Sequence, residues 1–297
     1  MKCAVIVVIH NGKKWYDKCF GSLKESTYPL DIIVVDNNSS DDSVEYISNK
    51  FPEIILIKNS SNDGFAKGNN LGIKFAYDRG YDFLFLLNQD AWIEPNTAEK
   101  LIEISNNNSD YGIISPVHLT GDKNNFDRGF IHYFHTSDSL HAYENLYLGK
   151  NDPDCYDTCF VNAAAWLVTR KCIEVVGGFD TIMFRHYAED GNYCNRVLFH
   201  KLKIGITTSV TICHDRENRI DEPFDVKLIF AERYANILLG KKWYFKHIVK
   251  TFSKPSLRNM RNGIKEIVFV VKNFRKIKDS RKINMVSGAG RKYFSTL

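Results

Sequence analysis

The sequence predicts an α/β fold with a doubly wound, mostly parallel central sheet. Residues 3–9, 31–36 and 82–90 are continuous apolar runs rich in β-branched and aromatic side chains, which is typical of strands covered on both faces. Segments with helical signals lie between these runs. Strands and helices that alternate in this way favour a parallel sheet, whose ligands bind beyond the carboxyl ends of the strands.

The helices are predicted from their ends and from the spacing of their apolar residues. Residues 40–51 open with capping side chains and then place Val44 and Ile47 three positions apart. Residues 69–80 have a helical period and stop at a glycine. Between these two helices, residues 53–59 predict a further short strand.

The second half of the chain begins with a polar stretch. Residues 106–160 show no clear period, and we expect a long loop region there, of the kind that forms lids or binding loops. Residues 159–180 predict a strand and a short helix, and residues 187–203 predict a helix with acidic residues in its first turn. Residues 204–215 alternate as a last pair of strands that carries His214.

Charge divides the chain into two parts. Residues 223–297 carry 18 Lys and Arg against 4 Asp and Glu, a net charge of +14, so residues 1–222 carry −9 of the total of +5. We therefore expect one α/β domain at 1–222 and a basic, helical extension at 223–297. The length and the 44% of hydrophobic residues are ample for a domain core of this size.

The extension has the composition of an interfacial helical segment. Its lysines are mixed with large aromatic residues, namely Trp243, Tyr244, Phe245 and Phe252. Each Lys or Arg near an anionic leaflet contributes about 1 kcal/mol to binding, so an anionic membrane surface is a partner that this composition fits. No recognised nucleic-acid-binding module accompanies the basic residues, so nucleic acid is not an expected partner. Nothing in the sequence indicates an oligomeric state.

The cysteines and the N terminus indicate the compartment. Seven cysteines, spread from Cys3 to Cys213, favour reduced thiols over a disulfide framework. Cys155 and Cys159 lie near the His-rich residues 131–141, but their spacings match no recognised zinc pattern. The apolar stretch at the N terminus is too short for a signal peptide or a membrane span. We expect a cytoplasmic protein that the extension can attach to the inner face of the membrane.

Polar residues follow the ends of three predicted strands. These are residues 10–11, Asp36 and residues 88–90, which should meet at one edge of the sheet. A carboxylate there is costly to desolvate unless it is paired, hydrogen-bonded or bound to a metal. Asp36 therefore predicts either an Asx turn or a contact with a nucleotide base or ribose. Asp90 predicts a divalent cation, since Mg²⁺ binds through one or two carboxylates plus substrate phosphates. His214 is either a second protein ligand of this cation or a buried core histidine whose ring nitrogens are hydrogen-bonded.

Two further features also have two interpretations. Gly64 and Gly68 precede a predicted helix and would let the backbone approach a phosphate-bearing ligand, although their spacing is no recognised phosphate-binding motif. Glu189 and Asp190 begin a predicted helix. They either complement the helix dipole or include a general base.

Five blocks of sequence carry a family resemblance. They are "VIVVIHNG", "IIVVDNNSSDDS", "NDGFAKGNNLGI", "LLNQDA" and "GGFDTIMFRHYAEDGNYCNRV". In this order, and over about residues 3–216, they resemble glycosyltransferase family 2, the inverting enzymes with the GT-A fold. "LLNQDA" is similar to the metal-binding D-x-D region, and the last block to the G-G-F-D and E-D-x-D segment. The resemblance is closest to rhamnosyltransferase-like and galactofuranosyltransferase-like bacterial members.

The resemblance implies an activity and a role for each matched position. The activity would be inverting transfer of a sugar from a nucleoside diphosphate sugar, of UDP or dTDP type, to a hydroxyl of a saccharide or lipid-linked acceptor in bacterial surface polysaccharide synthesis. Asp90 and His214 would hold Mg²⁺ or Mn²⁺, Asp190 would take the acceptor proton, and Glu189 would orient the acceptor. Donor contacts are implied for Ile9, His10, Asn11, Asp36, Asn38, Asn62, Gly64, Lys67, Asn69, Asn70, Asn88 and Gln89.

Three positions depart from the family pattern. Asn88 stands at the first acidic position of D-x-D, Asn192 at the second Asp of E-D-x-D, and His10 at the place of the usual Tyr. Two other classes of function therefore stay open, a nucleotidyltransferase on a related sheet and a non-catalytic sugar-nucleotide-binding protein. Because Asp190 begins a helix, we also expect its pKa to be low.

Overall fold

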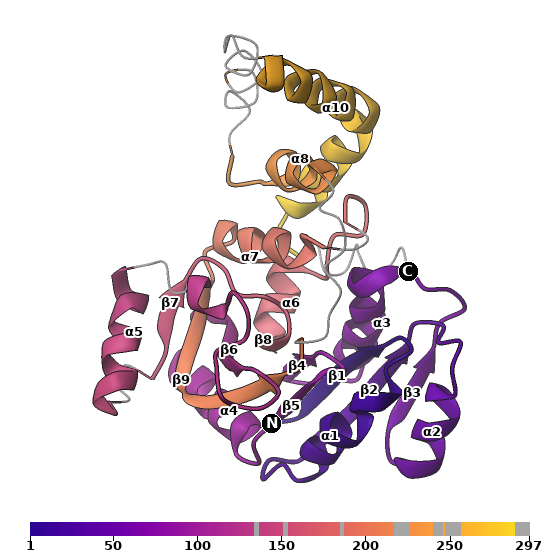
Figure 1. Cartoon of the computed structure of the whole chain (residues 1–297), viewed down its shortest axis with the longest axis vertical. Helices are drawn as coiled ribbons and strands as arrows, with labels where there is room; N and C mark the ends of the chain where they lie inside the picture. Colours follow the sequence, from indigo (N-terminus) through magenta and orange to yellow (C-terminus); the bar gives the residue numbers. More distant parts are fainter. Residues whose placement is uncertain are drawn as a thin grey trace.

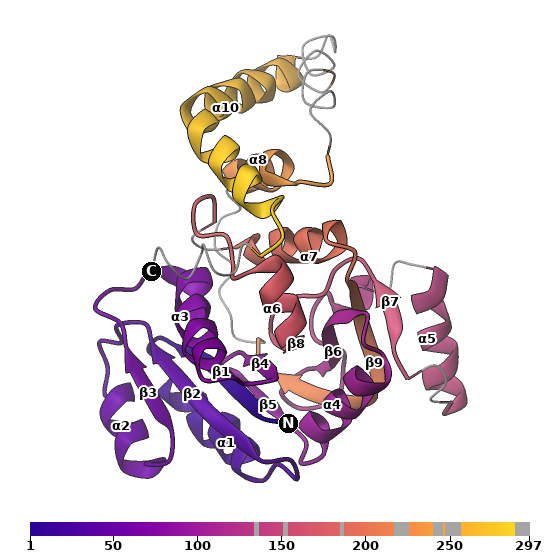
Figure 2. The same cartoon turned by 180° about the vertical axis from the view of Figure 1, so that it is seen from behind.

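The chain forms one α/β body with a helical extension at one end (Figures 1 and 2). The computed structural model describes residues 1–133, 137–150, 154–184, 187–216, 226–239, 246 and 257–288. The predicted domain boundary at 222 and the aromatic residues Trp243, Tyr244, Phe245 and Phe252 lie outside the described residues.

One nine-stranded sheet runs through the body. Its strands are β1 (Cys3–Ile9), β2 (Leu30–Asp36), β3 (Ile55–Lys58), β4 (Phe83–Leu87), β5 (Ala91–Ile93), β6 (Tyr111–Leu119), β7 (Tyr156–Thr158), β8 (Ala165–Thr169) and β9 (Lys203–His214). Their order is β3-β2-β1-β4-β8-β6-β9-β5, and β7 pairs with β9. The β3-β2-β1-β4 half and the β6–β9 pair are parallel, whereas β5, β7 and β8 pair antiparallel with their neighbours. The predicted α/β fold is thus confirmed, with a parallel first half and a mixed second half.

Apolar layers cover both faces of the sheet. Helices α3 (Gly64–Asp78), α6 (Arg170–Val176) and α7 (Glu189–Phe199) pack on one face, and α1 (Lys13–Lys24), α2 (Ser43–Lys50) and α4 (Thr97–Asn107) on the other. In β1, Ala4 and Ile6 belong to the first layer, and Val5 and Val7 belong to the second. Because both faces are buried, the strands read as continuous apolar runs in the sequence.

The prediction of a long loop at residues 106–160 is wrong. This stretch holds β6, the 3-10 helix η1 (Phe130–Tyr133), α5 (Ser137–Leu148) and β7. The strand β6 is buried over nearly its whole length, and within it Ser115 Oγ and His118 Nε2 lie 3.1 Å apart. A buried strand that includes polar residues such as Ser115 and His118 shows neither alternation nor an unbroken apolar run, so its periodicity is hidden.

The predicted pair of strands at residues 204–215 is one bent strand. β9 pairs with β6, shifts register between Pro116 and Val117, and then pairs with β5, where Ala91 lies opposite His214. Such an irregularity bends a strand. It carries the last residue of β9 to the segment that follows β4.

Helix α3 begins earlier than predicted, at Gly64. Gly68 and Gly72 lie on its buried side, where a Cβ would come within 2.7 Å of Val8 and 2.5 Å of Ile6. Glycine at these positions lets α3 approach β1 closely. The close packing of α3 on β1 therefore accounts for Gly68 without a ligand.

The C-terminal extension is joined to the body by buried polar contacts. Its helices α8 (Val226–Ala235) and α10 (Leu257–Asn284) lie side by side (Figure 1). Asp180 is fully buried and lies in the chain segment that connects α6 to α7. Ser280 and Asn284 of α10 both donate hydrogen bonds to one of its carboxylate oxygens. The other oxygen accepts the backbone N–H groups of Ile182 and Met183. None of the helices in the described part of the chain has the length and apolarity to cross a bilayer.

Candidate active site

The carboxyl ends of β1, β2 and β4 meet at one edge of the sheet, as predicted. Parallel pairing places Ile9 beside Asp36, and β4 flanks β1 on its other side. Gln89, after β4, holds the end of β1 with its amide. Its Oε1 accepts the backbone N–H of His10 at 3.0 Å, and its Nε2 donates to the His10 carbonyl at 3.3 Å.

Asp36 forms an Asx-type turn. Its Oδ1 accepts the backbone N–H of Ser39 at 3.1 Å, and the side chain is 4% exposed. Asn11 contacts the same turn, because its Oδ1 accepts the backbone N–H of Ser40 at 2.8 Å. Asn11 and Asn38 have φ values of 49° and 63°, a left-handed conformation that Asn tolerates better than most residues. The turn describes what Asp36 does in the protein, and its contact with a nucleotide stays a prediction.

The start of α3 is tied to β2 by side-chain amides. The amide nitrogen of the buried Asn37 donates to Oδ1 of Asn62 at 3.0 Å and to the carbonyl of Gly64 at 3.1 Å. Lys67 pairs with Asp63 at 2.9 Å. These contacts fix the loop that enters α3 beside the carboxyl end of β2. Donor contacts of Asn62, Gly64 and Lys67 remain predictions of the resemblance.

Asn69 and Asn70, two of the predicted donor contacts, are buried and hydrogen-bonded within the protein. Asn70 is buried, with its Oδ1 accepting the N–H of Phe179 at 2.7 Å and its Nδ2 donating to the Phe179 carbonyl at 2.9 Å. Asn69 is also buried and donates to the carbonyl of Phe65 at 3.0 Å. Because α3 begins at Gly64, both Asn residues lie inside the helix, where Asn69 bonds the preceding turn and Asn70 joins the helix to Phe179.

Asp90 and His214 come together although they are distant in the sequence. The antiparallel pairing of β5 with β9 places Ala91 opposite His214, and the backbone N–H of Asp215 donates to the Asp90 carbonyl at 2.9 Å. As a result, Asp90 Oδ1 lies 3.3 Å from His214 Nε2. Asn88 Nδ2 lies 3.3 Å from the same nitrogen.

This pair fits a divalent cation. Two adjacent ligands of an octahedral Mg²⁺, each about 2.1 Å from the ion, are about 3 Å apart, close to the separation of Asp90 Oδ1 and His214 Nε2. A carboxylate oxygen and an imidazole nitrogen are ligands that Mn²⁺ accepts. Rotation of the Asn88 amide by a half turn would present its oxygen to the same place.

His214 is buried against a second carboxylate, Asp127. Its Nδ1 lies 2.9 Å from Asp127 Oδ2. Burial opposes a charge on the ring, but hydrogen bonds to Asp127 and Asp90 outweigh it and raise the pKa of His214. Burial likewise opposes ionisation of Asp127, and the contacts with His214 and Arg216 nevertheless lower the pKa of that carboxyl. Sequence reasoning missed Asp127, which lies in the stretch interpreted as a loop.

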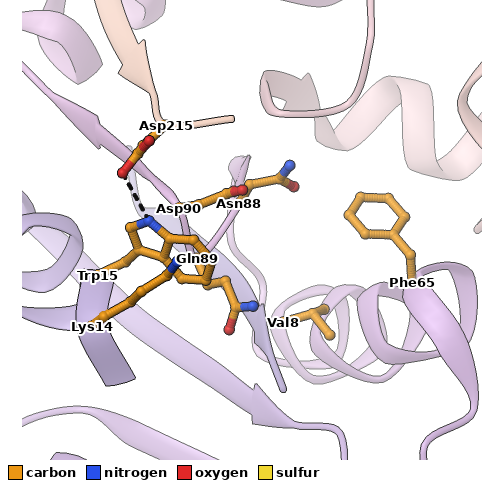
Figure 3. A pocket seen from close by; sticks show the side chains of 8 residues that line it. All are labelled: Val8, Lys14, Trp15, Phe65, Asn88, Gln89, Asp90 and Asp215. Carbon is orange, nitrogen blue, oxygen red and sulfur yellow. Dashed lines mark hydrogen bonds between the residues drawn. The ribbon is translucent and has the colours of Figure 1, made fainter. Parts of the chain in front are cut away.

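A cleft of about 280 Å³ opens beside Asp90. Figure 3 shows Trp15 and Lys14 on one side and the ring of Phe65 on the other, with Asn88 between them. The indole N–H of Trp15 donates to Asp215 Oδ2 at 3.1 Å. Sequence reasoning also missed Lys14, Trp15 and Asp215, although the first two follow the block "VIVVIHNG" almost directly and Asp215 follows His214.

A second cleft of about 280 Å³ adjoins the first, and Phe65 and Asn88 line both. Glu189, Asp190 and His214 line it together with Arg216. Its other walls are partly aromatic, formed by Tyr133, Phe160 and Tyr187. The structure thus brings the predicted metal pair and the predicted acidic pair to two adjoining clefts.

A family model decides the assignment. Residues 4–168, more than half of the 297-residue chain, match the model of glycosyl transferase family 2. The chain belongs to this family. Among curated relatives, the dTDP-rhamnosyl transferase RfbF of Shigella flexneri is 23% identical over 213 residues, which are 71% of this chain and 68% of RfbF. The low-salt glycan biosynthesis hexosyltransferase Agl10 of Haloferax volcanii is 24% identical over 222 residues, 71% of this chain and 69% of Agl10.

Solved structures confirm the GT-A fold of this family 2 member. S. aureus TarS (residues 1–349), in complex with UDP-GlcNAc, has a TM-score of 0.59 and 14% identity, covering 96% of this chain and 90% of that one. GalNAc-T7 with UDP, GalNAc and Mn²⁺ has a TM-score of 0.63 and 14% identity, covering 79% and 48%. Asp190 and His214 lie beyond the residues that match the family model.

Burial is the main influence on the pKa values of the acidic pair, Glu189 and Asp190, at the start of α7 in this family 2 member. Burial, together with the charge of the neighbouring Asp190, raises the pKa of Glu189 to about 8. Burial also raises the pKa of Asp190, against the backbone N–H groups of Gly191 and Ala163. The predicted low pKa of Asp190 is therefore wrong, because desolvation outweighs the helix N-terminus. A pKa of about 8 favours the protonated form of Glu189 at neutral pH, and this form can donate a hydrogen bond.

The backbone that leads into this pair is strained. Tyr187 and Ala188 have φ values of 66° and 68°, in the left-handed region. Such a conformation costs about 1–3 kcal/mol for each non-glycine residue and persists where the surrounding structure enforces it. Here it turns the chain so that α7 begins with Glu189 and Asp190 in the wall of the second cleft.

Proposed function

We propose that this family 2 member is an inverting glycosyltransferase. It moves a hexosyl or deoxyhexosyl group from a UDP- or dTDP-sugar to a hydroxyl of a saccharide or lipid-linked acceptor in bacterial surface polysaccharide synthesis. The observation that carries the proposal is the pair of adjoining clefts, one with Asp90 and the other with Asp190, which share Asn88 and Phe65. The similarity to RfbF, whose name records dTDP-rhamnosyl transfer, supports a donor of this type.

The donor occupies the first cleft. Asp90 and His214 would hold Mg²⁺ or Mn²⁺, which neutralises the charge of the departing diphosphate. Lys14 lines the same cleft and adds a positive charge. Asn88 can offer the cation an oxygen but no charge, so a second positive charge in the cleft helps to neutralise the diphosphate. The carboxyl ends of β1 and β2, with Asn11 and Asp36, lie where the nucleoside would bind.

The acceptor occupies the second cleft. Its hydroxyl attacks the anomeric carbon on the side opposite the diphosphate, and Asp190 takes the proton as the new bond forms. The raised pKa makes Asp190 a stronger base than an exposed Asp. Protonated Glu189 donates a hydrogen bond to the acceptor and orients it. Attack from the opposite side inverts the anomeric configuration.

A panel of UDP-, dTDP- and GDP-sugars with Mn²⁺ tests this function. We expect one class of donor to raise the unfolding midpoint, with about 2.7 kcal/mol of stabilisation at 100 times its Kd. With an added acceptor, the product should have the inverted anomeric configuration by NMR. Release of pyrophosphate from a nucleoside triphosphate, without stabilisation by any sugar donor, would instead identify a nucleotidyltransferase. Stabilisation without transfer or donor hydrolysis would indicate a binding protein.

The extension, we further propose, attaches the enzyme to an anionic, cytoplasmic membrane surface, where lipid-linked acceptors are found. One side of α10 exposes Ile264, Val268 and Val271, the last of them 70% exposed, and Phe274 beside them is 62% exposed. Basic residues flank this apolar row, namely Lys265, Lys272, Arg275, Lys276 and Lys278. An exposed apolar row with basic flanks fits an anionic bilayer, to which each Lys or Arg adds about 1 kcal/mol.

Point substitutions test this attachment better than truncation, because truncation would strip buried Asp180 of Ser280 and Asn284. We expect full-length Val271→Glu/Phe274→Glu to sediment less than the wild type with vesicles that contain phosphatidylglycerol. The matched control is Tyr147→Glu on α5, an apolar residue that is 91% exposed away from the extension. Equal sedimentation of the double variant and the wild type would refute attachment through α10.

A further inference from the structure

We propose that Asp127 is a positioning residue that sets His214 for metal binding, an inference that rests on the proposed metal pair. The two side chains are 87 positions apart in the sequence, and Asp127 Oδ2 lies 2.9 Å from His214 Nδ1. They are 2% and 1% exposed, so water does not compete for this contact. Asp127 lies outside all five blocks that carry the family resemblance.

The contact decides which nitrogen of His214 faces the cation. A neutral imidazole has one N–H and one lone pair. With the proton on Nδ1 and donated to Asp127, Nε2 keeps its lone pair and lies 3.3 Å from Asp90 Oδ1, on the side of the cation. Without an acceptor at Nδ1, the proton can move to Nε2 and block it. A carboxylate partner also makes the imidazole a stronger ligand.

Asp127 is itself held in place. Its backbone N–H donates to the His118 carbonyl at 2.9 Å, and its carbonyl accepts the N–H of Phe130 at 2.8 Å. The guanidinium of Arg216 lies 3.5 Å from the same carboxylate oxygen that contacts His214. These contacts anchor the carboxylate to β6 and η1 and hold it against the imidazole.

The neighbouring His118 offers a different explanation, a cation held among His118, Asp127 and His214. Their ligand atoms lie within 4.8 Å of one another. However, His118 Nε2 is 3.1 Å from Ser115 Oγ, and neither His118 nor Asp127 lines either cleft. Because two of its three ligands line neither cleft, an ion among these residues would lie away from a donor in the first cleft. The geometry favours the hydrogen bond.

Mn²⁺ titrations of the full-length protein, followed by electron paramagnetic resonance with and without saturating UDP, test the inference. We expect Asp127→Ala and Asp127→Asn each to weaken Mn²⁺ binding by about 10- to 100-fold. In a His214→Ala background, Asp127→Ala should cause no further loss, because Asp127 acts through His214. Asp157→Asn is the matched control. This half-buried carboxylate accepts a hydrogen bond from Tyr111 on β6, and its loss should leave Mn²⁺ affinity unchanged.

The outcomes separate this inference from the proposed function. If Asp90→Ala weakens Mn²⁺ binding but Asp127→Ala and Asp127→Asn do not, Asp127 is not a positioning residue. An equal loss from Asp127→Ala with and without His214 would also overturn the inference, because it would indicate a general structural role. If Asp90→Ala binds Mn²⁺ like the wild type, the proposed metal pair itself is wrong. Thermal unfolding without metal checks that each variant is folded.

Discussion

Asp190→Asn is expected to lower the rate of sugar transfer by about two to four orders of magnitude. The amide cannot take the acceptor proton, whereas the donor cleft, which Asp190 does not line, is unaltered. Donor affinity should therefore be unchanged. Product formation at saturating substrates measures the rate, and calorimetry with the donor and Mn²⁺ measures the affinity.

Two controls accompany this test, the stability of the Asp190→Asn variant and the rate of a variant with a neighbouring carboxyl group changed. Because burial raises the pKa of Asp190, its ionisation costs stability as pH rises above the pKa of an unfolded Asp. Asp190→Asn removes that cost and should be at least as stable as the wild type at pH 8. Glu232→Gln alters a carboxyl group of α8 that interacts with Asp190 but lines neither cleft, so it should cause a much smaller loss of rate. A near-normal rate for Asp190→Asn would exclude Asp190 as the base.

Asp90→Ala is expected to remove the effect of Mn²⁺ on donor binding. A cation that neutralises a diphosphate is worth several kcal/mol, so donor affinity in Mn²⁺ should fall by at least about 100-fold. In EDTA, the wild type and the variant should bind the donor equally weakly. Calorimetric titration of the donor with Mn²⁺ and with EDTA measures both effects.

Two variants of the same cleft sharpen this test. Asp215→Asn changes a carboxylate that holds Trp15, so the difference between Mn²⁺ and EDTA should persist. Asn88→Asp places a carboxylate where the amide nitrogen now lies 3.3 Å from His214, and it should strengthen Mn²⁺ binding. If the wild type binds the donor equally well in Mn²⁺ and in EDTA, the metal pair has no part in donor binding.

Much of the candidate site could be predicted because its residues lie at the ends of buried parallel strands. The runs that became β1, β2 and β4 are buried on both faces, and their polar ends had to meet at one edge. For the same reason Asp36 and Asp90 were recognisable as unusual carboxylates. The metal pair also required His214, which the bend of β9 and its pairing with β5 carry to Asp90.

Other parts of the site could not be predicted because their signals are not local. Asn70 has a polar amide of the kind that often binds ligands, yet its hydrogen-bond partner is the backbone of Phe179, 109 positions away. Asp127 lies in a stretch without periodicity, and its importance comes from a contact with a strand that ends 87 positions later. The pKa of Asp190 depended on burial, which outweighs the helix dipole.

The sequence by itself determined the α/β class, the edge where polar strand ends gather, and the family, because these follow from local runs and ordered motifs. Only the tertiary structure decided which polar residues face the clefts and which are used inside the protein. It also decided that the pKa values of the acidic pair are raised, and which residue is the partner of His214. Burial and contacts between distant segments set these properties, and neither can be predicted from the spacing of residues that are close in the sequence.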